Sequence, residues 1–210
     1  MQDQVEDIFT EQEGVDPDTL ANLGPLRSLA GAWEGMKGLD INPFEASERR
    51  QEFIERIELQ PTDPQSNGPQ LFYGLRYHTL ITKPDEVETY HNQVGFWLWE
   101  PATGLILHSL SIPRGQIALA KGHAEADATS FEVTAKRGST ENGICSTAFL
   151  EHAFRTDSFK MQVTVNPDGT WSYFEDTLLT VLGRSAPFHH TDRNTLTRIA
   201  APTPNPLARV

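Results

Sequence analysis

The sequence predicts an all-β fold: a closed antiparallel up-and-down β-barrel of about ten strands, preceded by a short helical leader. Three observations predict it. Apolar and polar residues alternate with period two along most of the chain, turn residues separate these segments with almost no helical sequence between them, and Asp168-Gly169 is a strong two-residue hairpin signal. Short links favour antiparallel neighbours, because parallel pairing needs crossovers of a dozen residues or more. A closed barrel hides the sheet edges best, and a β-sandwich is the alternative.

The chain is predicted to divide into a helical leader, the barrel and a Pro-rich tail, over residues 1–23, 24–200 and 201–210. In the leader, a short first helix is predicted by three apolar residues at helical spacing, Val5, Ile8 and Phe9. A second helix is predicted to start with Asp16 as N-cap and Pro17 at the first helical position, and to end at Gly24-Pro25.

From Gly31 onward, the alternation predicts consecutive strands, each ended by turn residues. After the strand of Trp33, the predicted strands are Phe53–Leu59, Leu71–Ile81, Val87–Glu100, Leu105–Ile112, Ile117–Ala120, Phe131–Ala135, Ile144–Phe154, Ser158–Val165, Trp171–Leu182 and about Phe188–Ile199. The interior of a ten-stranded barrel is too wide for side chains to fill completely, so we expect a cavity for a small apolar ligand.

Composition limits the classes of function. The 210 residues fit one domain, and 17 basic against 29 acidic residues give a net charge of −12, which disfavours binding to nucleic-acid phosphates or anionic lipids. The lone Cys145 excludes an intrachain disulfide. The acidic start lacks the features of a secretion signal, and no apolar run is long enough to cross a bilayer. We therefore expect a cytoplasmic protein that binds neither nucleic acid nor membrane; whether it forms a homodimer stays open.

One segment resembles a family motif. Gly31-Ala32-Trp33-Glu34-Gly35 places a Trp between two glycines at a strand start, which suits a barrel floor, because the indole can plug the closed end. It resembles the Gly-x-Trp-x-Gly opening of the nitrobindin family, haem-binding barrels related in shape to fatty-acid-binding proteins and lipocalins. The segment 90–97 is similar to that family's His-x-Glu-x-Gly-Phe strand, with Gln93 in place of the acid. Pro187-Phe188-His189-His190, with Leu196 and Arg198, resembles its final strand, and the whole resemblance spans about residues 24–200.

The resemblance implies haem b, with the proximal iron ligand on the final strand. A haem iron takes a neutral imidazole aimed into an apolar pocket. His189 and His190 point to opposite faces of a strand, so at most one enters the barrel. We choose His190, which matches the family position, and keep His189 as the second choice; the alternative is that both are surface histidines. The other residues expected around the haem are Trp33, Gly35, Gly38 and His91, although His91, like His78 and His108, also fits a strand histidine with local hydrogen bonds.

Two functions follow and stay open. The resemblance implies a ferric haem protein that binds nitric oxide and isomerises peroxynitrite to nitrate. The alternative is a non-catalytic carrier of a fatty acid or another small hydrophobic ligand, with Arg76 or Arg114 pairing with a carboxylate. No hydrolase signature competes, because Ser185, His190 and Asp192 are not accompanied by a Gly-x-Ser-x-Gly nucleophile elbow.

The segment after Gly35 departs from the family pattern. Where the family is rich in glycine, residues 36–43 are bulkier and include an acid, Asp40. We expect this departure to reshape or block the pocket, so that the fold can carry over where haem does not.

Overall fold

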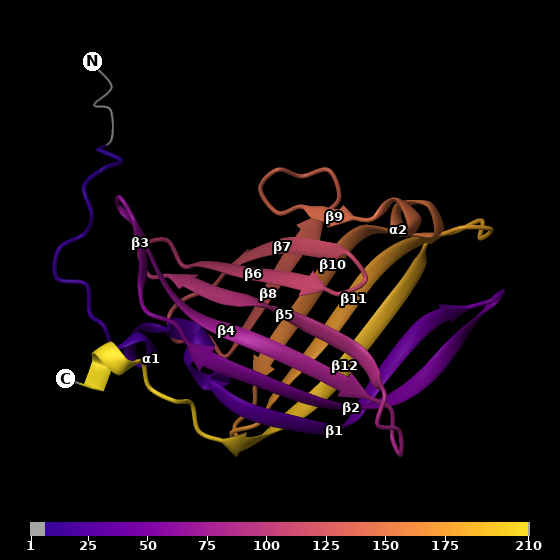
Figure 1. Cartoon of the computed structure of the whole chain (residues 1–210), viewed down its shortest axis with the longest axis horizontal. Helices are drawn as coiled ribbons and strands as arrows, with labels where there is room; N and C mark the ends of the chain where they lie inside the picture. The colour runs from indigo at the N-terminus through magenta and orange to yellow at the C-terminus, as the bar shows by residue number, and fades with distance from the viewer. Residues whose placement is uncertain (1–6, 210) are drawn as a thin grey trace.

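The computed structural model describes residues 7–209 and confirms the closed antiparallel barrel (Figure 1). Neighbouring strands pair in chain order, β12 returns to pair with β1, and a β2–β4 pairing bypasses the short β3 and closes the ring. The ten barrel strands are β1 (Gly31–Phe44), β2 (Ser47–Pro61), β4 (Gln70–Thr82), β5 (Thr89–Glu100), β6 (Leu105–Ile112), β7 (Gln116–His123), β8 (Ser130–Lys136), β10 (Phe154–Val165), β11 (Trp171–Val181) and β12 (Phe188–Ala200).

The remaining elements are short. They are α1 (Thr19–Asn22), the 3-10 helix η1 (Gly24–Leu29), β3 (Gln65–Asn67), β9 (Ile144–Ser146), α2 (Ala148–Ala153) and the 3-10 helix η2 (Pro206–Arg209). The strand predicted over Ile144–Phe154 was wrong, because only its first residues pair, with β7, and a helix follows. That helix starts at Thr147, whose side chain accepts a hydrogen bond from the Leu150 N–H.

The leader also differs from expectation. Its helix is capped by Asp18, which accepts from the Ala21 N–H, and starts two residues later than predicted. Asp16 instead accepts from the N–H of Asp18 at 2.9 Å, which is a turn rather than a cap. Residues 7–13, which carry Ile8 and Phe9 of the predicted first helix, form turns and bends; Val5 lies outside the described residues.

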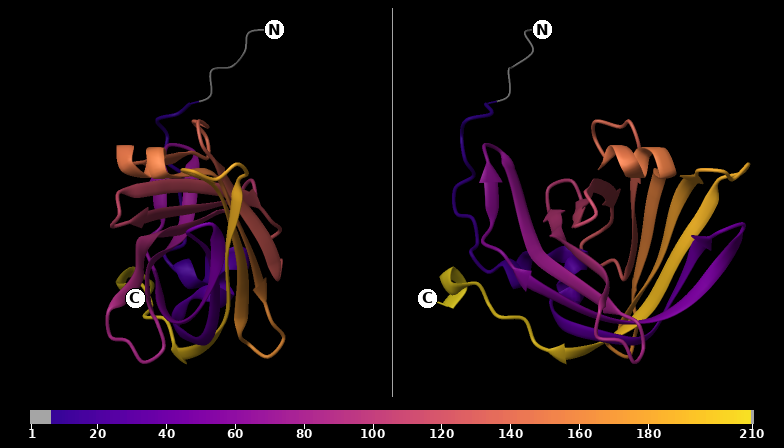
Figure 2. Two further views of the ribbon diagram at one scale, coloured as in Figure 1. Left: turned by 90° about the vertical axis from the view of Figure 1, so that its right-hand side faces the viewer. Right: turned by 45° about the vertical axis from the view of Figure 1, so that its right-hand side comes forward.

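Trp33 plugs the closed end of the barrel, as expected from its flanking glycines. Its indole is 1% exposed, donates to the Leu29 carbonyl at 2.8 Å, and meets Trp171 edge to face at 6.1 Å between ring centroids. The 3-10 helix η1 lies under it and buries Leu26 and Leu29 completely. Figure 2 shows this leader segment, in indigo, at one end of the ring of strands. We call this end the floor, and the opposite end, where β12 begins and β1 ends, the mouth.

Side chains pack against one another in the middle of the barrel. Trp97 stacks on His108 at 3.9 Å and meets Phe131 edge to face, and Leu75, Ile106 and the floor residues pack around them. A hollow of about 880 Å³ is lined largely by outward-facing residues of β4, β5 and β7, such as His78 and Phe96, and by residues 138–145. A second, of about 790 Å³, lies where the outer faces of β1, β11 and β12 meet.

After β12, the tail runs back towards the leader (Figure 1). Residues 201–205 have no regular structure, and Asn205 is buried with its amide donating to the Pro17 carbonyl at 3.2 Å. None of the described helices has the length and apolar run that crossing a membrane requires.

Candidate ligand site at the barrel mouth

A β-bulge in β1 decides which residues face the mouth. Gly35 pairs with Glu55 and Gly38 with Phe53, so β1 has one residue more than β2 between these two pairs. The extra residue reverses the alternation: Trp33 and Gly35 are buried before the bulge, and Gly38 and Asp40 after it. Without the bulge, Asp40 would point outwards. With it, the carboxylate points into the barrel.

The inward Asp40 meets His190, which also faces the interior from the start of β12. The Nε2 atom of His190 lies 2.9 Å from Asp40 Oδ1 and 3.4 Å from Asp192 Oδ2. The Asp40 side chain is 5% exposed and that of His190 31%. This imidazole nitrogen is therefore already engaged by two carboxylates, at a place that solvent reaches through the mouth.

Asp40 is held by more than His190. Its Oδ2 atom accepts from the Tyr90 hydroxyl at 2.5 Å and from the Asn42 amide at 2.7 Å. Burial works to raise the pKa of Asp40, but the hydrogen bonds from His190 and Tyr90 outweigh it, and the net pKa is lowered. Asp40 is thus a fixed, ionised carboxylate.

Three carboxyl groups stand side by side on adjacent strands. Asp40 pairs with Asp192 across β1 and β12, and Asp192 pairs with Glu175 across β12 and β11. Side chains of directly opposed residues share one face of the sheet, and like charges there repel. We call Asp40, His190, Asp192 and Glu175 the mouth cluster.

The charged groups of the mouth cluster shift one another's pKa values. Burial would lower the pKa of His190, but the hydrogen bond to Asp40 and the nearby charges of Asp192 and Glu175 outweigh it and raise the pKa to about 9. Burial, followed by the charge of Asp192, raises the pKa of Glu175; burial also raises the pKa of Asp192, against the opposing charge of His190. At neutral pH His190 is therefore an imidazolium and Asp40 a carboxylate, whereas Glu175 and Asp192 are only partly ionised.

His91 is a second imidazole near the mouth cluster. Burial, with the charges of Arg114 and His190, lowers its pKa, although a hydrogen bond with Gln93 at 3.3 Å opposes the shift. Gln93 donates to the Tyr77 hydroxyl at 2.7 Å, and His108 Nε2 lies 2.9 Å from the same oxygen. His91 is thus neutral and linked by hydrogen bonds to the aromatic core.

The other predicted haem residues lie elsewhere. Trp33 is seven residues from Asp40 along β1, roughly 20 Å away at about 3.3 Å per residue. A Cβ on Gly35 would overlap the Asn194 amide, and one on Gly38 would overlap the Phe53 ring, so protein side chains occupy the space that both glycines leave. His189 points outwards, with its side chain 66% exposed and its Nδ1 2.9 Å from Asp176. Of the predicted residues, the structure brings only His190 and His91 to the mouth.

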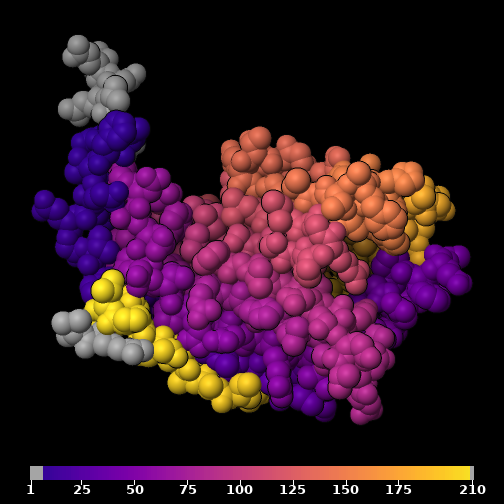
Figure 3. Space-filling view, viewed as in Figure 1, coloured from indigo at the N-terminus to yellow at the C-terminus, as the bar shows by residue number. Residues whose placement is uncertain are grey.

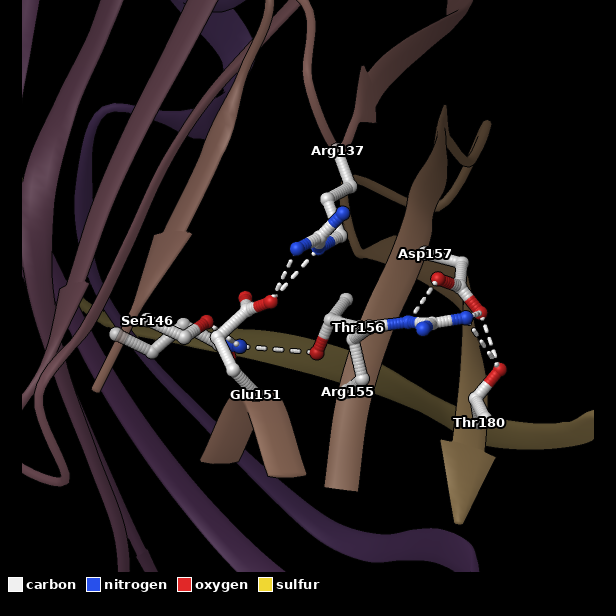
Figure 4. Close-up of polar contacts among 8 residues, drawn as sticks. Arg137, Ser146, Glu151, Arg155, Thr156, Asp157 and Thr180 are labelled. Carbon is white, nitrogen blue, oxygen red and sulfur yellow. Dashed lines mark hydrogen bonds and ion pairs between the residues drawn. The ribbon is translucent and has the colours of Figure 1, made fainter. Parts of the chain in front are cut away.

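Polar contacts also tie the rim of the mouth together near α2 (Figure 4). Arg137 contacts Glu151 of α2 at 2.5 Å, and Arg155 contacts Asp157 at 2.8 Å. In the same region the Gln116 amide bridges Ser146 of β9 and Thr156 of β10, at 2.9 Å each. In the space-filling view, the orange segment that includes β9 and α2 forms a ridge along the upper edge of the molecule (Figure 3). The rim on this side is thus fixed by side chains.

Comparison with known protein families identifies the family of this barrel. The family model described as the THAP4-like, heme-binding beta-barrel domain matches residues 22–198. The chain belongs to this family. The family was thus correctly inferred from the sequence motifs, and its matched range agrees with the limits of the barrel.

A search of solved structures supports the fold alone. The barrel is similar to the crystal structure of Rv2717c from M. tuberculosis, with a TM-score of 0.59 and 18% sequence identity over 86% of this chain and 96% of that chain. The comparison with curated proteins found no match.

The mouth cluster does not fit haem, although the family description suggests it. An iron ligand must be a neutral imidazole with a free nitrogen in an apolar pocket. Here Nε2 of His190 is held by Asp40 and Asp192, the ring is cationic, and Glu175 stands beside it. Haem also carries two propionates, and the carboxylates of the mouth cluster would repel their negative charges. The segment that departs from the family pattern after Gly35 is thus the one that turns the Asp40 carboxylate towards His190.

Sequence reasoning missed most of the mouth cluster. Asp40 was noticed as a departure but given no partner, Asp192 was considered only for a hydrolase triad, and Glu175 and Tyr90 were given no role. The signal for Asp40 was the break in alternation at Met36-Lys37, where two exposed residues follow each other. Asp192 and Glu175 carry no comparable local signal, because only the β11–β12 register brings them together.

Proposed function

We propose that this chain is a small-ligand-binding barrel that takes a positively charged ligand at the mouth cluster. The family supports a small-ligand barrel. The observation that carries the proposal is the row of three opposed carboxyl groups, Asp40, Asp192 and Glu175, with a single cationic side chain, His190, among them. A bound cation would offset both the burial and the mutual repulsion that keep Asp192 and Glu175 partly protonated.

The division of the interior supports the same site. The floor and the middle of the barrel are packed with aromatic and aliphatic side chains, so a ligand has no room there. His190 and Asp192, by contrast, are 31% and 20% exposed in their side chains. A small ligand can reach them from solvent without any movement of the core.

Haem b with nitrogen-oxide chemistry is the function that the resemblance to nitrobindins implied. His190 is the residue that would hold the iron, and the haem would supply nitric oxide binding and peroxynitrite isomerisation. The engaged and protonated His190 weighs against this function, and we do not propose it for this chain.

The fatty-acid carrier has less support. It requires an apolar cavity and a basic partner for the carboxylate inside the barrel. Arg76 and Arg114 are both exposed, and the described interior is filled by aromatic side chains such as Trp97. An acidic mouth would also repel a fatty-acid carboxylate.

The proposal is tested by following the imidazole signals of His190 by NMR while four probes are added separately: hemin, oleate, an organic amine such as spermidine, and a divalent metal salt. We expect the amine, the metal ion or both to shift the His190 signals, and hemin and oleate to leave them unchanged. A sharp Soret band with hemin that is lost in His190→Ala would overturn the proposal in favour of haem. The proposal would also be overturned if none of the cations shifted the His190 signals.

A further inference from the structure

The mouth cluster resembles a metal-binding site more than a simple ion pair. The ligand atoms of Asp40, His190 and Asp192, one from each side chain, all lie within 4.8 Å of one another. Within residues 7–209, no other group of three or more His, Cys, Asp or Glu side chains meets this condition. Metal–nitrogen and metal–oxygen bonds of about 2.0–2.2 Å place the ligands of one zinc ion roughly 3.4 Å apart, so small side-chain shifts would suffice.

Two further observations point to a ligand here. Glu175, opposite Asp192 on β11, is half-buried and has no hydrogen bond or ion pair with any described residue. The Asp40 carboxylate is oriented by Tyr90 and Asn42, which leave its Oδ1 atom directed at His190. Partners that fix the direction of a carboxylate in this way are typical around metal ligands.

We propose that Asp40, His190 and Asp192 bind one divalent transition-metal ion of the Zn²⁺, Fe²⁺ or Mn²⁺ class. This inference rests on the proposed function and names its ligand class. One imidazole and two carboxylates form a mixed nitrogen and oxygen set, which suits these ions better than Ca²⁺, Mg²⁺ or Cu⁺.

An outward histidine–aspartate pair, which shares only β12 with the inner pair, serves as a matched control. His189 on β12 lies 2.9 Å from Asp176 on β11, the same separation as between His190 and Asp40. This outer pair lacks a third ligand atom and is more exposed. If a close histidine–aspartate pair were enough to bind the ion, both pairs would do so; if three converging ligands are needed, only the inner one will.

The experiment uses the full chain, stripped with a chelator and titrated calorimetrically with ZnCl₂ and with MnCl₂. We expect one ion per chain, with Zn²⁺ bound more tightly than Mn²⁺, as the general order of affinities requires. Asp192→Asn should weaken Zn²⁺ binding by about 100-fold, since loss of a direct ligand costs at least as much as loss of a supporting residue. Asp176→Asn should leave the affinity unchanged. The imidazole ¹⁵N signal of Nε2 should move on His190 and not on His189.

Circular dichroism and thermal melting of the metal-free variants show whether Asp192→Asn still folds, and His190→Gln replaces it if it does not. Absence of one-to-one binding, or equal affinity in wild type and Asp192→Asn, would overturn the metal site. If spermidine moves the His190 signals and neither metal ion does, the metal inference fails while the proposed function stands. If no cation moves them, both fail.

Discussion

The floor and the mouth of this barrel are built on the same strands but follow opposite rules. On β12, Leu196 near the floor is completely buried against aromatic rings, whereas His190 and Asp192 at the mouth are partly exposed and charged. On β1, Trp33 and Asp40 are both buried, but the first is an aromatic ring at the floor and the second a carboxylate at the mouth. The comparison teaches that stability is concentrated at the floor, while the mouth, where we propose that the ligand binds, carries electrostatic repulsion that reduces stability.

The largest effect is expected at the floor. Trp33→Ala removes a fully buried indole and its hydrogen bond to Leu29, and should lower the free energy of unfolding by about 3–5 kcal/mol. Urea denaturation measures this loss. Ile199→Ala, at a side chain that is 57% exposed, is the control and should change little. Equal effects at the two positions would show that burial of the Trp33 indole does not stabilise the floor.

The next effect lies between floor and mouth, at Glu55. Burial raises its pKa from 4.5 to about 7, while hydrogen bonds from Tyr173 and Asn194 oppose the shift. A buried carboxyl group with a raised pKa does not reduce the free energy of unfolding below pH 4.5, where it is protonated in both states. Above pH 7 it reduces that free energy by the full amount, so stability falls as the pH rises from 4.5 to about 7. Glu55→Gln should therefore stabilise the protein by roughly 3 kcal/mol above pH 7 and have little effect near pH 4. Urea denaturation at both pH values tests this, and a gain that does not depend on pH would contradict it.

A smaller effect is expected within the mouth cluster. Asp40→Asn should lower the pKa of His190 from about 9 towards its usual value by at least about one unit, or about 1.4 kcal/mol. Because the raised pKa of His190 stabilises the fold below pH 6.5 and this contribution is lost as the pH rises through 9, the variant should also lose stability mainly at low pH. NMR titration of the imidazole measures the shift, and Asp176→Asn is the control. An unchanged His190 pKa would show that Asp40 does not raise the pKa of His190.

The smallest effect should come from Tyr90→Phe, which removes one of the donors to Asp40. The other donors remain, and the phenol is only partly buried, so we expect a loss of about 1 kcal/mol in the free energy of unfolding. The variant should also raise the pKa of Asp40, followed by its carboxyl ¹³C signal. A loss as large as that of Trp33→Ala would mean that the mouth contributes to stability as much as the floor does.

The sequence predicted the barrel well because its signals are local. Period-two alternation and the Asp168-Gly169 turn indicate strands and a hairpin, and β10 and β11 pair on both sides of that turn. The helix α2 was missed because apolar residues near Ile144 and Phe154 imitate a strand, while the cap at Thr147 is a weaker signal. The mouth cluster was only half predicted: the inward direction of His190 follows from alternation and the family motif, but that of Asp40 depends on a bulge that reverses the alternation.

The most direct measurement is a long-range ¹H–¹⁵N correlation spectrum of the histidine rings in wild-type protein without metal, at about pH 7.5. His190, held between Asp40 and Asp192, should appear as an imidazolium with both ring nitrogens protonated, and His91 as a neutral ring. A neutral His190 with an unprotonated Nε2 at that pH would contradict the acidic mouth and leave the nitrogen free for haem iron.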